Sequence, residues 1–359
     1  MSDEDFYYKY DEGTLTKLLI FRLYTREWLP VFLSKPHPDY KGVHIFDFFC
    51  GSGSDSVGSL GSPLITLDEL RACYQSGKMQ GWGKSPLVVH FFDKDKDCIH
   101  NLQKKIESEK RSVSGVEIDC RELAFENALQ QYNNTLSDNS IAKLLIIDPF
   151  GVKEMSADVF KKLVSFPVTD FIFFIPSEIL NRFRDHPSIK QKIKRPDDPY
   201  HVHRAVIEYY REQAEKTANF FLSPFAIKKE NGRLYGLVFG AKHLRGVMKF
   251  LKIAWKCDPN AGEANFDIQR DNLSRDQSQG TLFEMRSKVS EFQEELENVI
   301  REKKIKDERD LIYFCGINGM TCQHCKGVLE KLIAEDVIES AFIVPNPQKL
   351  KTPRVIKYL

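Results

Sequence analysis

The chain has no long apolar run, no large net charge and no framework of paired cysteines. No apolar stretch reaches the roughly 20 residues that a membrane-spanning helix needs, so we expect no contact with a membrane. Residues 1–12 are acidic and aromatic, which argues against a signal peptide. A net charge of +1 gives no general attraction to nucleic acid, so any such binding has to come from a local basic patch.

The cysteine and hydrophobic contents indicate a reduced, globular protein. Eight cysteines are scattered along 359 residues, which is typical of free thiols and predicts a cytoplasmic location. A hydrophobic content of 42% is ample for one main core and a small accessory domain.

The most informative motif is the turn D-F-F-C-G-S-G at residues 47–53, which follows an apolar run at 43–46. Glycine has no Cβ to block a ligand and tolerates left-handed backbone angles. The pattern differs from the G-x-G-x-x-G that binds a pyrophosphate, so it favours S-adenosylmethionine (SAM) over NAD. The predicted cofactor contacts in this turn are Asp47, Phe49, Gly51, Ser52 and Gly53.

Two further acidic strand ends fit the same cofactor. The apolar run 87–92 ends in Asp93 and Lys94, and an acid at this place can accept both hydroxyls of a ribose. A third strand near 116–118 leads to Asp119 and Glu122, either of which can meet the adenine amine. The sequence does not separate these last two.

A second motif, Asp148-Pro149-Phe150-Gly151, follows the apolar run 143–147. The Asp148 carboxylate and the Pro149 carbonyl can accept hydrogen bonds from an exocyclic amine, while Phe150 stacks on the ring. Gly151 permits the bend and is assigned to the substrate side. The motif predicts methylation of a planar amine.

The spacing of apolar runs predicts an α/β fold with a mostly parallel sheet. Strands are expected near 43–47, 87–92, 116–118, 143–147 and 170–175, with helices near 64–76, 96–108 and 156–165. Segments 218–228 and 233–240 flank Asn231-Gly232 and predict an antiparallel hairpin. This is the Rossmann-like sheet of class I SAM methyltransferases.

Several short motifs, taken in order, resemble the three-Cys-motif partner family. They are an amino-terminal helix with Lys17, Tyr24 and Trp28, the turn at 47–53, G-S-P-L at 61–64, F-D-K-D at 92–95, D-P-F-G at 148–151 and L-Y-G-L-V-F-G-A-K-H at 234–243. The resemblance covers about residues 10–260. It implies a class I SAM-dependent methyltransferase fold, and a radical-SAM-like protein with three cysteines as partner. The D-P-F-G turn is also similar to that of tRNA guanine-N2 dimethyltransferases, which favours a nucleic-acid amine as acceptor.

A basic segment at 181–204 lies between the fifth predicted strand and the next helix. It is expected as an insert beside the active site, where it can neutralise the phosphates of RNA or DNA. An equally weighted alternative is a solvated surface insert. The candidate substrate-binding residues are Arg182, Arg184, Lys192, Lys194 and Arg195.

The remaining chain predicts a separate carboxyl-terminal domain. The first domain is expected at 1–257, a polar linker at 258–280, and a winged-helix-like domain at 281–359. Two helices followed by short apolar runs are the basis of that outline. Nucleic-acid contact and protein docking are equally weighted roles for it.

The tail also contains G-M-T-C-Q-H-C at 319–325. Cys322 and Cys325, with Cys315 and His324, can be read as a copper or zinc site. The preferred interpretation has no metal, because Thr321 can serve as a helix N-cap and only 34 residues follow the motif.

Three hypotheses follow from these patterns. The preferred one is a SAM-dependent methyltransferase acting on a nucleic-acid amine. The second is a non-catalytic subunit with a methyltransferase fold that binds a radical-SAM-like partner. The third is a metal-handling protein centred on Cys322 and Cys325.

Overall fold

The computed structural model describes residues 9–36, 40–149, 156–175, 205, 208–212, 220–229, 234–265 and 287–359. These form two compact units, 1–242 and 243–359. The helix α10 (Leu244–Cys257), expected in the first domain, is grouped with the second unit. The start of the predicted linker is ordered around Asp258, whose carboxylate accepts hydrogen bonds from the backbone N–H groups of Asn260, Ala261, Glu263 and Ala264.

The first unit is built on a seven-stranded sheet with the order β3-β2-β1-β4-β5-β7-β6. Its strands are β1 (Gly42–Asp47), β2 (Leu87–Asp93), β3 (Val116–Glu122), β4 (Ile141–Ile147), β5 (Thr169–Ile175), β6 (Phe221–Lys228) and β7 (Leu234–Ala241). Strands β1 to β5 are parallel, and β7 runs antiparallel to both β5 and β6. This order is that of class I methyltransferases, so the α/β prediction is confirmed.

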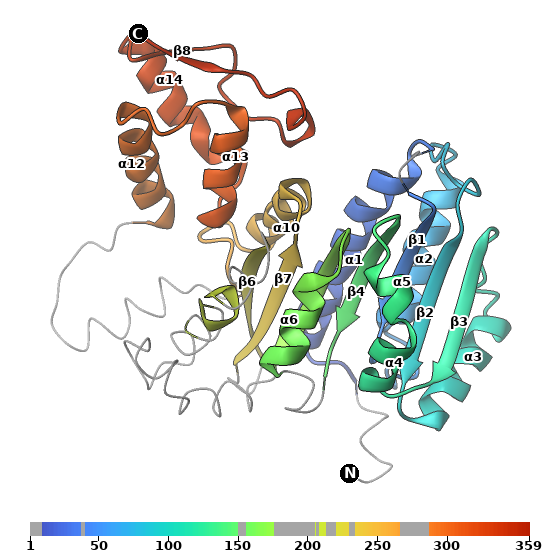
Figure 1. The fold of residues 1–359 in the computed structure, drawn as a ribbon. Coiled ribbons are helices and arrows are strands. Elements are labelled where there is room, and N and C mark those ends of the chain that lie inside the picture. Colours follow the sequence, from blue (N-terminus) through green and yellow to red (C-terminus); the bar gives the residue numbers. More distant parts are fainter. Residues whose placement is uncertain are drawn as a thin grey trace, which may run out of the picture. The chain divides into compact units, whose positions relative to one another are not determined.

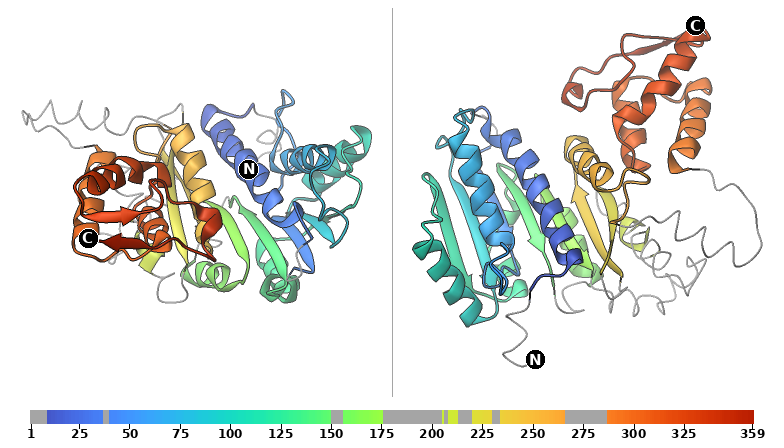
Figure 2. Two further views of the ribbon diagram at one scale, coloured as in Figure 1. Left: turned by 90° about the horizontal axis from the view of Figure 1, so that it is seen from above. Right: turned by 180° about the vertical axis from the view of Figure 1, so that it is seen from behind.

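Helices cover both faces of this sheet (Figures 1 and 2). On one face lie α1 (Glu12–Leu33), α2 (Ser62–Gln75) and α3 (Lys96–Ser108), and on the other α4 (Phe125–Gln131), α5 (Asn133–Ser137) and α6 (Ala157–Ser165). The helices predicted near 64–76, 96–108 and 156–165 are confirmed. The short α4 and α5 were not predicted, and β3 extends four residues beyond the predicted end at 118.

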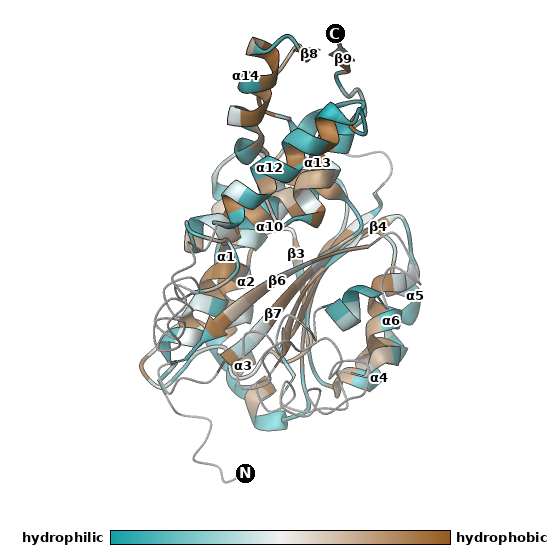
Figure 3. Ribbon diagram, turned by 90° about the vertical axis from the view of Figure 1, so that its left-hand side faces the viewer, coloured by the Kyte–Doolittle hydropathy of each residue, from teal (hydrophilic) through white to brown (hydrophobic). Residues whose placement is uncertain are grey.

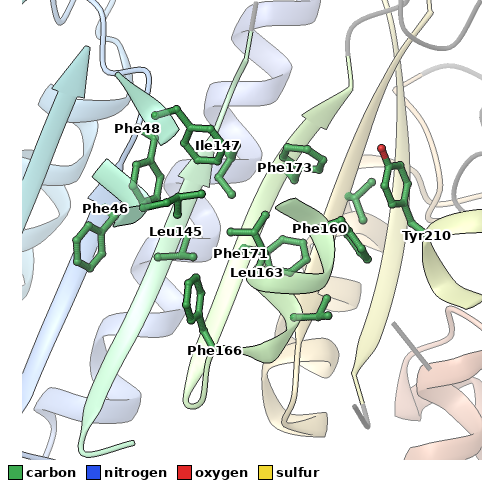
Figure 4. Packing of buried hydrophobic residues seen from close by; sticks show 14 of the residues in the cluster. Phe46, Phe48, Leu145, Ile147, Phe160, Leu163, Phe166, Phe171, Phe173 and Tyr210 are labelled. Atoms are coloured by element: carbon green, nitrogen blue, oxygen red, sulfur yellow. The ribbon is translucent and has the colours of Figure 1, made fainter. Parts of the chain in front are cut away.

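The core between the sheet and α4, α5 and α6 is rich in aromatic side chains. Figure 4 shows side chains from β1, β4 and β5 meeting side chains from α6. The labelled members of this cluster are Phe46, Phe48, Leu145, Ile147, Phe160, Leu163, Phe166, Phe171, Phe173 and Tyr210. Figure 3 shows strands coloured mostly as hydrophobic and helices with both colours, as expected for a sheet covered on both faces.

The long helix α1 buries its apolar side against the opposite face of the sheet. It begins after Asp11, whose side chain accepts a hydrogen bond from the Thr14 backbone N–H. Tyr24 and Trp28 are almost wholly buried. The Tyr24 hydroxyl donates a 2.7 Å hydrogen bond to the carboxylate of Asp170 on β5. This bond joins α1 to the middle of the sheet.

The second unit contains helices followed by a small antiparallel hairpin, as predicted. After α10 come α12 (Lys288–Arg301), α13 (Glu308–Ile317), the 3-10 turn η3 (Cys322–Cys325), α14 (Lys326–Ala334), β8 (Ile338–Ser340), the 3-10 turn η4 (Pro347–Lys349) and β9 (Ile356–Tyr358). Glu308 is fully buried and pairs with Arg354, which fixes the start of α13 to the chain before β9. The assignment as a winged helix stays a prediction.

Within the described ranges, no helix is both long and apolar enough to cross a membrane.

Replacing Asp170 with asparagine is expected to change how stability depends on pH. Burial raises the pKa of Asp170 from 3.8 to about 7. The neutral carboxyl stabilises the folded state fully below pH 3.8, the pKa of the group in the unfolded chain. This stabilisation is lost as the pH rises through about 7, the pKa in the folded state. A difference of about three pKa units is worth up to about 4 kcal/mol. As the pH rises from about 4.5 to 7.5, the free energy of unfolding of Asp170→Asn, measured with urea, should therefore increase relative to that of wild type.

Asp158→Asn is the matched control, because the Asp158 side chain is 95% exposed. Its stability should follow that of wild type at every pH. Parallel curves for wild type and Asp170→Asn would contradict the raised pKa of Asp170.

Candidate active site

Three acids lie at the carboxyl ends of neighbouring parallel strands. Asp47 ends β1, Asp93 ends β2, and Asp148 directly follows β4. The residues that precede them, Phe46, Phe92 and Ile147, belong to the core under α4 to α6. Because side chains alternate along a strand, the three acids point toward the face that carries α1, α2 and α3. We call Asp47, Asp93 and Asp148 the acidic edge.

Asp47 is the most buried of the three acids. Its side chain is fully buried, and Oδ2 has no hydrogen-bond partner. Oδ1 accepts a 3.3 Å hydrogen bond from the Phe49 backbone N–H. Burial raises the pKa of Asp47 to about 7, and the negative charges of Asp148 and Asp93 also raise it. The Ser62 hydroxyl and the Phe49 N–H oppose this rise. A buried carboxylate oxygen without a partner is rare, and a cationic ligand would satisfy it.

The turn after Asp47 requires its two glycines for different reasons. Gly51 has φ of +57° and Gly53 has φ of +88°, both in the left-handed region. A Cβ on Gly51 would have no heavy atom within 4 Å, so the backbone there borders open space. A Cβ on Gly53 would lie 2.8 Å from Leu102 Cδ1. Gly51 thus leaves room beside the acidic edge, whereas Gly53 permits packing against α3.

Asp93 holds this turn in place. Its Oδ2 accepts a 3.0 Å hydrogen bond from the Gly51 N–H, and its Oδ1 accepts one of 3.0 Å from the Asp95 N–H. Burial raises the pKa of Asp93, while these two N–H groups oppose the rise. Each carboxylate oxygen has a second lone pair, so Asp93 can still accept a hydroxyl donor.

The segment 52–61 is fixed by contacts from both sides. Lys105 on α3 donates to the Ser52 carbonyl at 3.0 Å and to the Ser54 hydroxyl at 2.6 Å. Asp55 accepts hydrogen bonds from the backbone N–H groups of Tyr10 and Ser59. These bonds bring the start of α1 to the acidic edge.

The register of β2 and β3 separates Asp119 from Glu122. Glu122 pairs with Asp93 at the carboxyl end, and its side chain is exposed. Asp119 pairs with His90 three residues earlier, within the strands. Glu122 is therefore the one of the two that lies beside the acidic edge.

Asp119 belongs to a separate polar network. It accepts hydrogen bonds from the Tyr132 hydroxyl and from Arg121 Nε, and it lies 2.8 Å from His90 Nδ1. His90 Nε2 in turn lies 2.9 Å from His44 Nδ1. Although burial opposes it, these partners lower the pKa of Asp119 to about 2. The carboxylate is already engaged by protein groups.

Asp148 is ion-paired with Lys17 of α1. The Lys17 ammonium also lies over the ring of Phe174, 4.9 Å from its centroid. In the β4–β5 register Ile147 pairs with Phe173, so Asp148 and Phe174 are next to each other at the edge. Pro149 is buried. Phe150 and Gly151 lie outside the described residues, so their predicted roles stay predictions.

The remaining predicted site residues in the described ranges differ in exposure. Phe49 is half-buried and packs 5.3 Å from the ring of Phe125. Ser52 is half-buried in the turn, and Lys94 is exposed. The basic insert, with Arg182, Arg184, Lys192, Lys194 and Arg195, lies outside the described residues.

In the second unit, the cysteines of the C-x-x-C motif lie in the hydrophobic core. Cys315 and Cys325 are fully buried with their Sγ atoms 3.2 Å apart, and Cys322 Sγ lies 3.7 Å from Met248 Sδ. His324 Nδ1 accepts a 3.1 Å hydrogen bond from the Thr321 N–H, which completes a capping box. Thr321 thus opens the helical turn as predicted. No three His, Cys, Asp or Glu side chains among the described residues form a metal-binding group.

Sequence reasoning did not assign Tyr10, Ser62 and Phe174 to the site. Burial raises the pKa of Tyr10 to about 12, and the charges of Asp55, Asp148 and Asp47 add to the rise. Lys17 was noted only as part of the family resemblance. No local pattern connects it to Asp148, which is 131 residues away in the chain.

No protein-family model matches the chain, and no curated protein sequence matches it. Similar solved structures include an rRNA methylase from Streptococcus thermophilus, with 10% identity, 60% of this chain and 92% of that chain covered, and a TM-score of 0.32. An O-methyltransferase from Bacillus cereus in complex with SAH has 12% identity, coverage of 66% and 93%, and a TM-score of 0.33. A SAM-dependent methyltransferase from Agrobacterium tumefaciens has 8% identity, coverage of 64% and 61%, and a TM-score of 0.34.

Similarity this low transfers neither activity nor ligand to this chain. The fold is defined by the strand order and register. Membership in the three-Cys-motif partner family stays a prediction.

Alanine at the two glycines should destabilise the protein to different extents. Gly51→Ala should cost about 1 to 2 kcal/mol, the price of a left-handed angle alone. Gly53→Ala should cost roughly 1 kcal/mol more, because its Cβ also crowds Leu102 Cδ1 and Leu64 Cγ. Urea unfolding of both variants measures the difference. Equal losses would contradict the open space beside Gly51.

Proposed function

We propose that the protein is a SAM-dependent methyltransferase that acts on an exocyclic amine of a nucleic-acid base. The observation that carries the proposal is the buried, unpartnered Oδ2 of Asp47 between two other acids, at the carboxyl edge of a class I methyltransferase sheet. Ligands of open α/β sheets bind outside this edge, where the strand order reverses. Strands β1 and β4 are neighbours at that reversal.

The residues at this edge fit the chemical groups of SAM. Asp47 offers a carboxylate to a cation, Gly51 leaves its backbone open, and Asp93 has lone pairs for ribose hydroxyls. Glu122, at the end of the next strand, is the choice for the adenine amine. SAM supplies a methyl group on a positively charged sulfonium, which an acidic edge stabilises.

The protein's own contribution to the reaction would be positioning. The Asp148 carboxylate and the Pro149 carbonyl accept hydrogen bonds from the acceptor amine and aim its lone pair. Phe150, which lies outside the described residues, is proposed to support the planar acceptor by stacking. The basic insert at 181–204 and the carboxyl-terminal unit are proposed to contact RNA or DNA.

Affinity for SAM should rise with pH around neutrality. A cation binds ionised Asp47 better than the neutral acid, and the pKa of this buried group is about 7. The ionised fraction then grows from about one tenth at pH 6 to one half at pH 7, so the affinity should rise about fivefold. Calorimetry of Asp47→Asn should find no such dependence. A wild-type affinity that is flat over this range would contradict the role of Asp47.

Asp148→Ala should keep cofactor affinity within about twofold while methyl transfer is lost, because Asp148 is assigned to the acceptor. The assay is labelling of total cellular RNA, DNA and protein with tritiated SAM, beside calorimetry with S-adenosylhomocysteine. Loss of both properties would contradict the assignment.

The alternative is a non-catalytic subunit that binds a radical-SAM-like partner. It is favoured by the fact that both oxygens of Asp93, and one of Asp148, already have protein partners. An absence of heat with S-adenosylhomocysteine, unchanged by Asp93→Ala, would support this alternative and overturn the enzyme.

A further inference from the structure

We infer that the Asp148 carboxylate and the Phe174 ring form the binding site for the acceptor's amino group, and that Lys17 is a built-in occupant of this site. The inference rests on the proposed function and adds the acceptor subsite and its control. We call the pair of Asp148 and Phe174 the amino subsite.

The first support is the chemistry of the contact. The Lys17 ammonium donates to Asp148 Oδ2 and lies 4.9 Å from the centroid of the Phe174 ring. A carboxylate beside an aromatic face provides a hydrogen-bond acceptor and a π surface at one place. A base with an exocyclic amine needs both, one for its N–H and one for its ring.

The second support is position. Asp148 and Phe174 directly follow Ile147 and Phe173, which pair between β4 and β5 at the acidic edge. The charge of Asp148 also raises the pKa of Asp47. Asp148 is 33% exposed, so its carboxylate can be reached by a ligand, whereas the Phe174 ring is 5% exposed and has the Lys17 ammonium over it. An acceptor that replaces the Lys17 ammonium would therefore lie beside the part of the Phe174 ring that the ammonium now covers.

The third support is that the occupant comes from a distant part of the chain. Lys17 lies on α1, and its side chain is 20% exposed. An acceptor that donates to the same Oδ2 has to replace this ammonium. A large substrate can use binding energy from its remote parts for the replacement, whereas a free nucleoside cannot. Lys17 would thus select against small acceptors.

The transfer step is balanced by groups already named. The acceptor nitrogen gives its lone pair to the methyl carbon, and the electron pair of the breaking carbon–sulfur bond stays on sulfur. The surplus N–H proton passes to the Asp148 carboxylate and then to water. No oxidant or reductant is needed.

The chain provides a matched control for Lys17. Lys229 pairs with Asp11 at 2.9 Å and lies 4.4 Å from the centroid of the Tyr235 ring. Its side chain is 22% exposed, and that of Asp11 is 33% exposed, close to the values of Lys17 and Asp148. The two sites share their chemistry, but Asp11 is the N-cap of α1, and Lys229 pairs with it from the end of β6.

The test compares Lys17→Ala, Lys229→Ala and the double variant Lys17→Ala/Asp148→Ala in the full chain. Binding of adenosine, cytidine, guanosine and uridine is measured by calorimetry without SAM. Lys17→Ala should bind at least one of the three amine-bearing nucleosides about tenfold more tightly than wild type. Uridine has no exocyclic amine and should be unaffected. Lys229→Ala should resemble wild type, and the double variant should lose the gain.

A methyl-transfer assay with tritiated SAM provides the second readout. Lys17→Ala should label the nucleoside that it binds, and wild type should label it about tenfold less. No gain in nucleoside binding for Lys17→Ala, or an equal gain for Lys229→Ala, would overturn the inference. Circular dichroism of each variant checks that it is folded.

Failure of the proposed function has a different signature. If S-adenosylhomocysteine does not bind wild type, the enzyme assignment falls, whatever the nucleosides do. If Lys17→Ala binds and methylates n-butylamine but no nucleoside, the amino subsite stands and the base acceptor is overturned. A loss of transfer to every acceptor in Lys17→Ala, with cofactor binding intact, would make Lys17 a positioning residue and overturn its role as an occupant.

Discussion

The constraint on which the site depends is the crowding of three carboxylates at one edge of a parallel sheet. Each carboxylate repels the others, and burial raises the cost of their charge. The protein compensates each differently: Lys17 pairs with Asp148, two backbone N–H groups bond Asp93, and Asp47 keeps an oxygen with no partner. These contacts tie α1 to the edge through Lys17 and tie the glycine turn to it through the Gly51 N–H.

Much of this arrangement could be predicted from sequence, because the carboxyl ends of parallel strands meet at one edge. The acids at 47, 93 and 148 each follow an apolar run, and alternation sends all three to one face. The choice between Asp119 and Glu122 could not be predicted, since it depends on the length of β3 and its register with β2. A strand whose polar residues continue for four positions gives no local sign of where it ends.

The contacts of α1 were beyond prediction for a different reason. The spacing of apolar residues along a helix predicts which face is buried, so it identifies Tyr24 and Trp28 as packing residues. The pattern does not say which strand the helix crosses. Lys17 reaches Asp148, and Tyr24 reaches Asp170, across 131 and 146 residues of chain. One helix therefore supports the centre of the sheet and also completes the edge, and both effects depend on a docking that only tertiary structure defines.

Lys17, on α1, and Lys229, directly after β6, have the same kinds of contacts but different surroundings. Lys17 and Lys229 each pair with a carboxylate and lie over an aromatic ring, at similar exposure. Their contacts do not distinguish them, and partly exposed ion pairs of this kind contribute little to stability. What differs is the neighbourhood: Asp148 shares its surroundings with the unpartnered oxygen of Asp47, whereas Asp11 caps a helix. The surroundings of Asp148 include a buried carboxylate oxygen without a partner, and those of Asp11 do not. We therefore assign the functional role to Lys17 and not to Lys229.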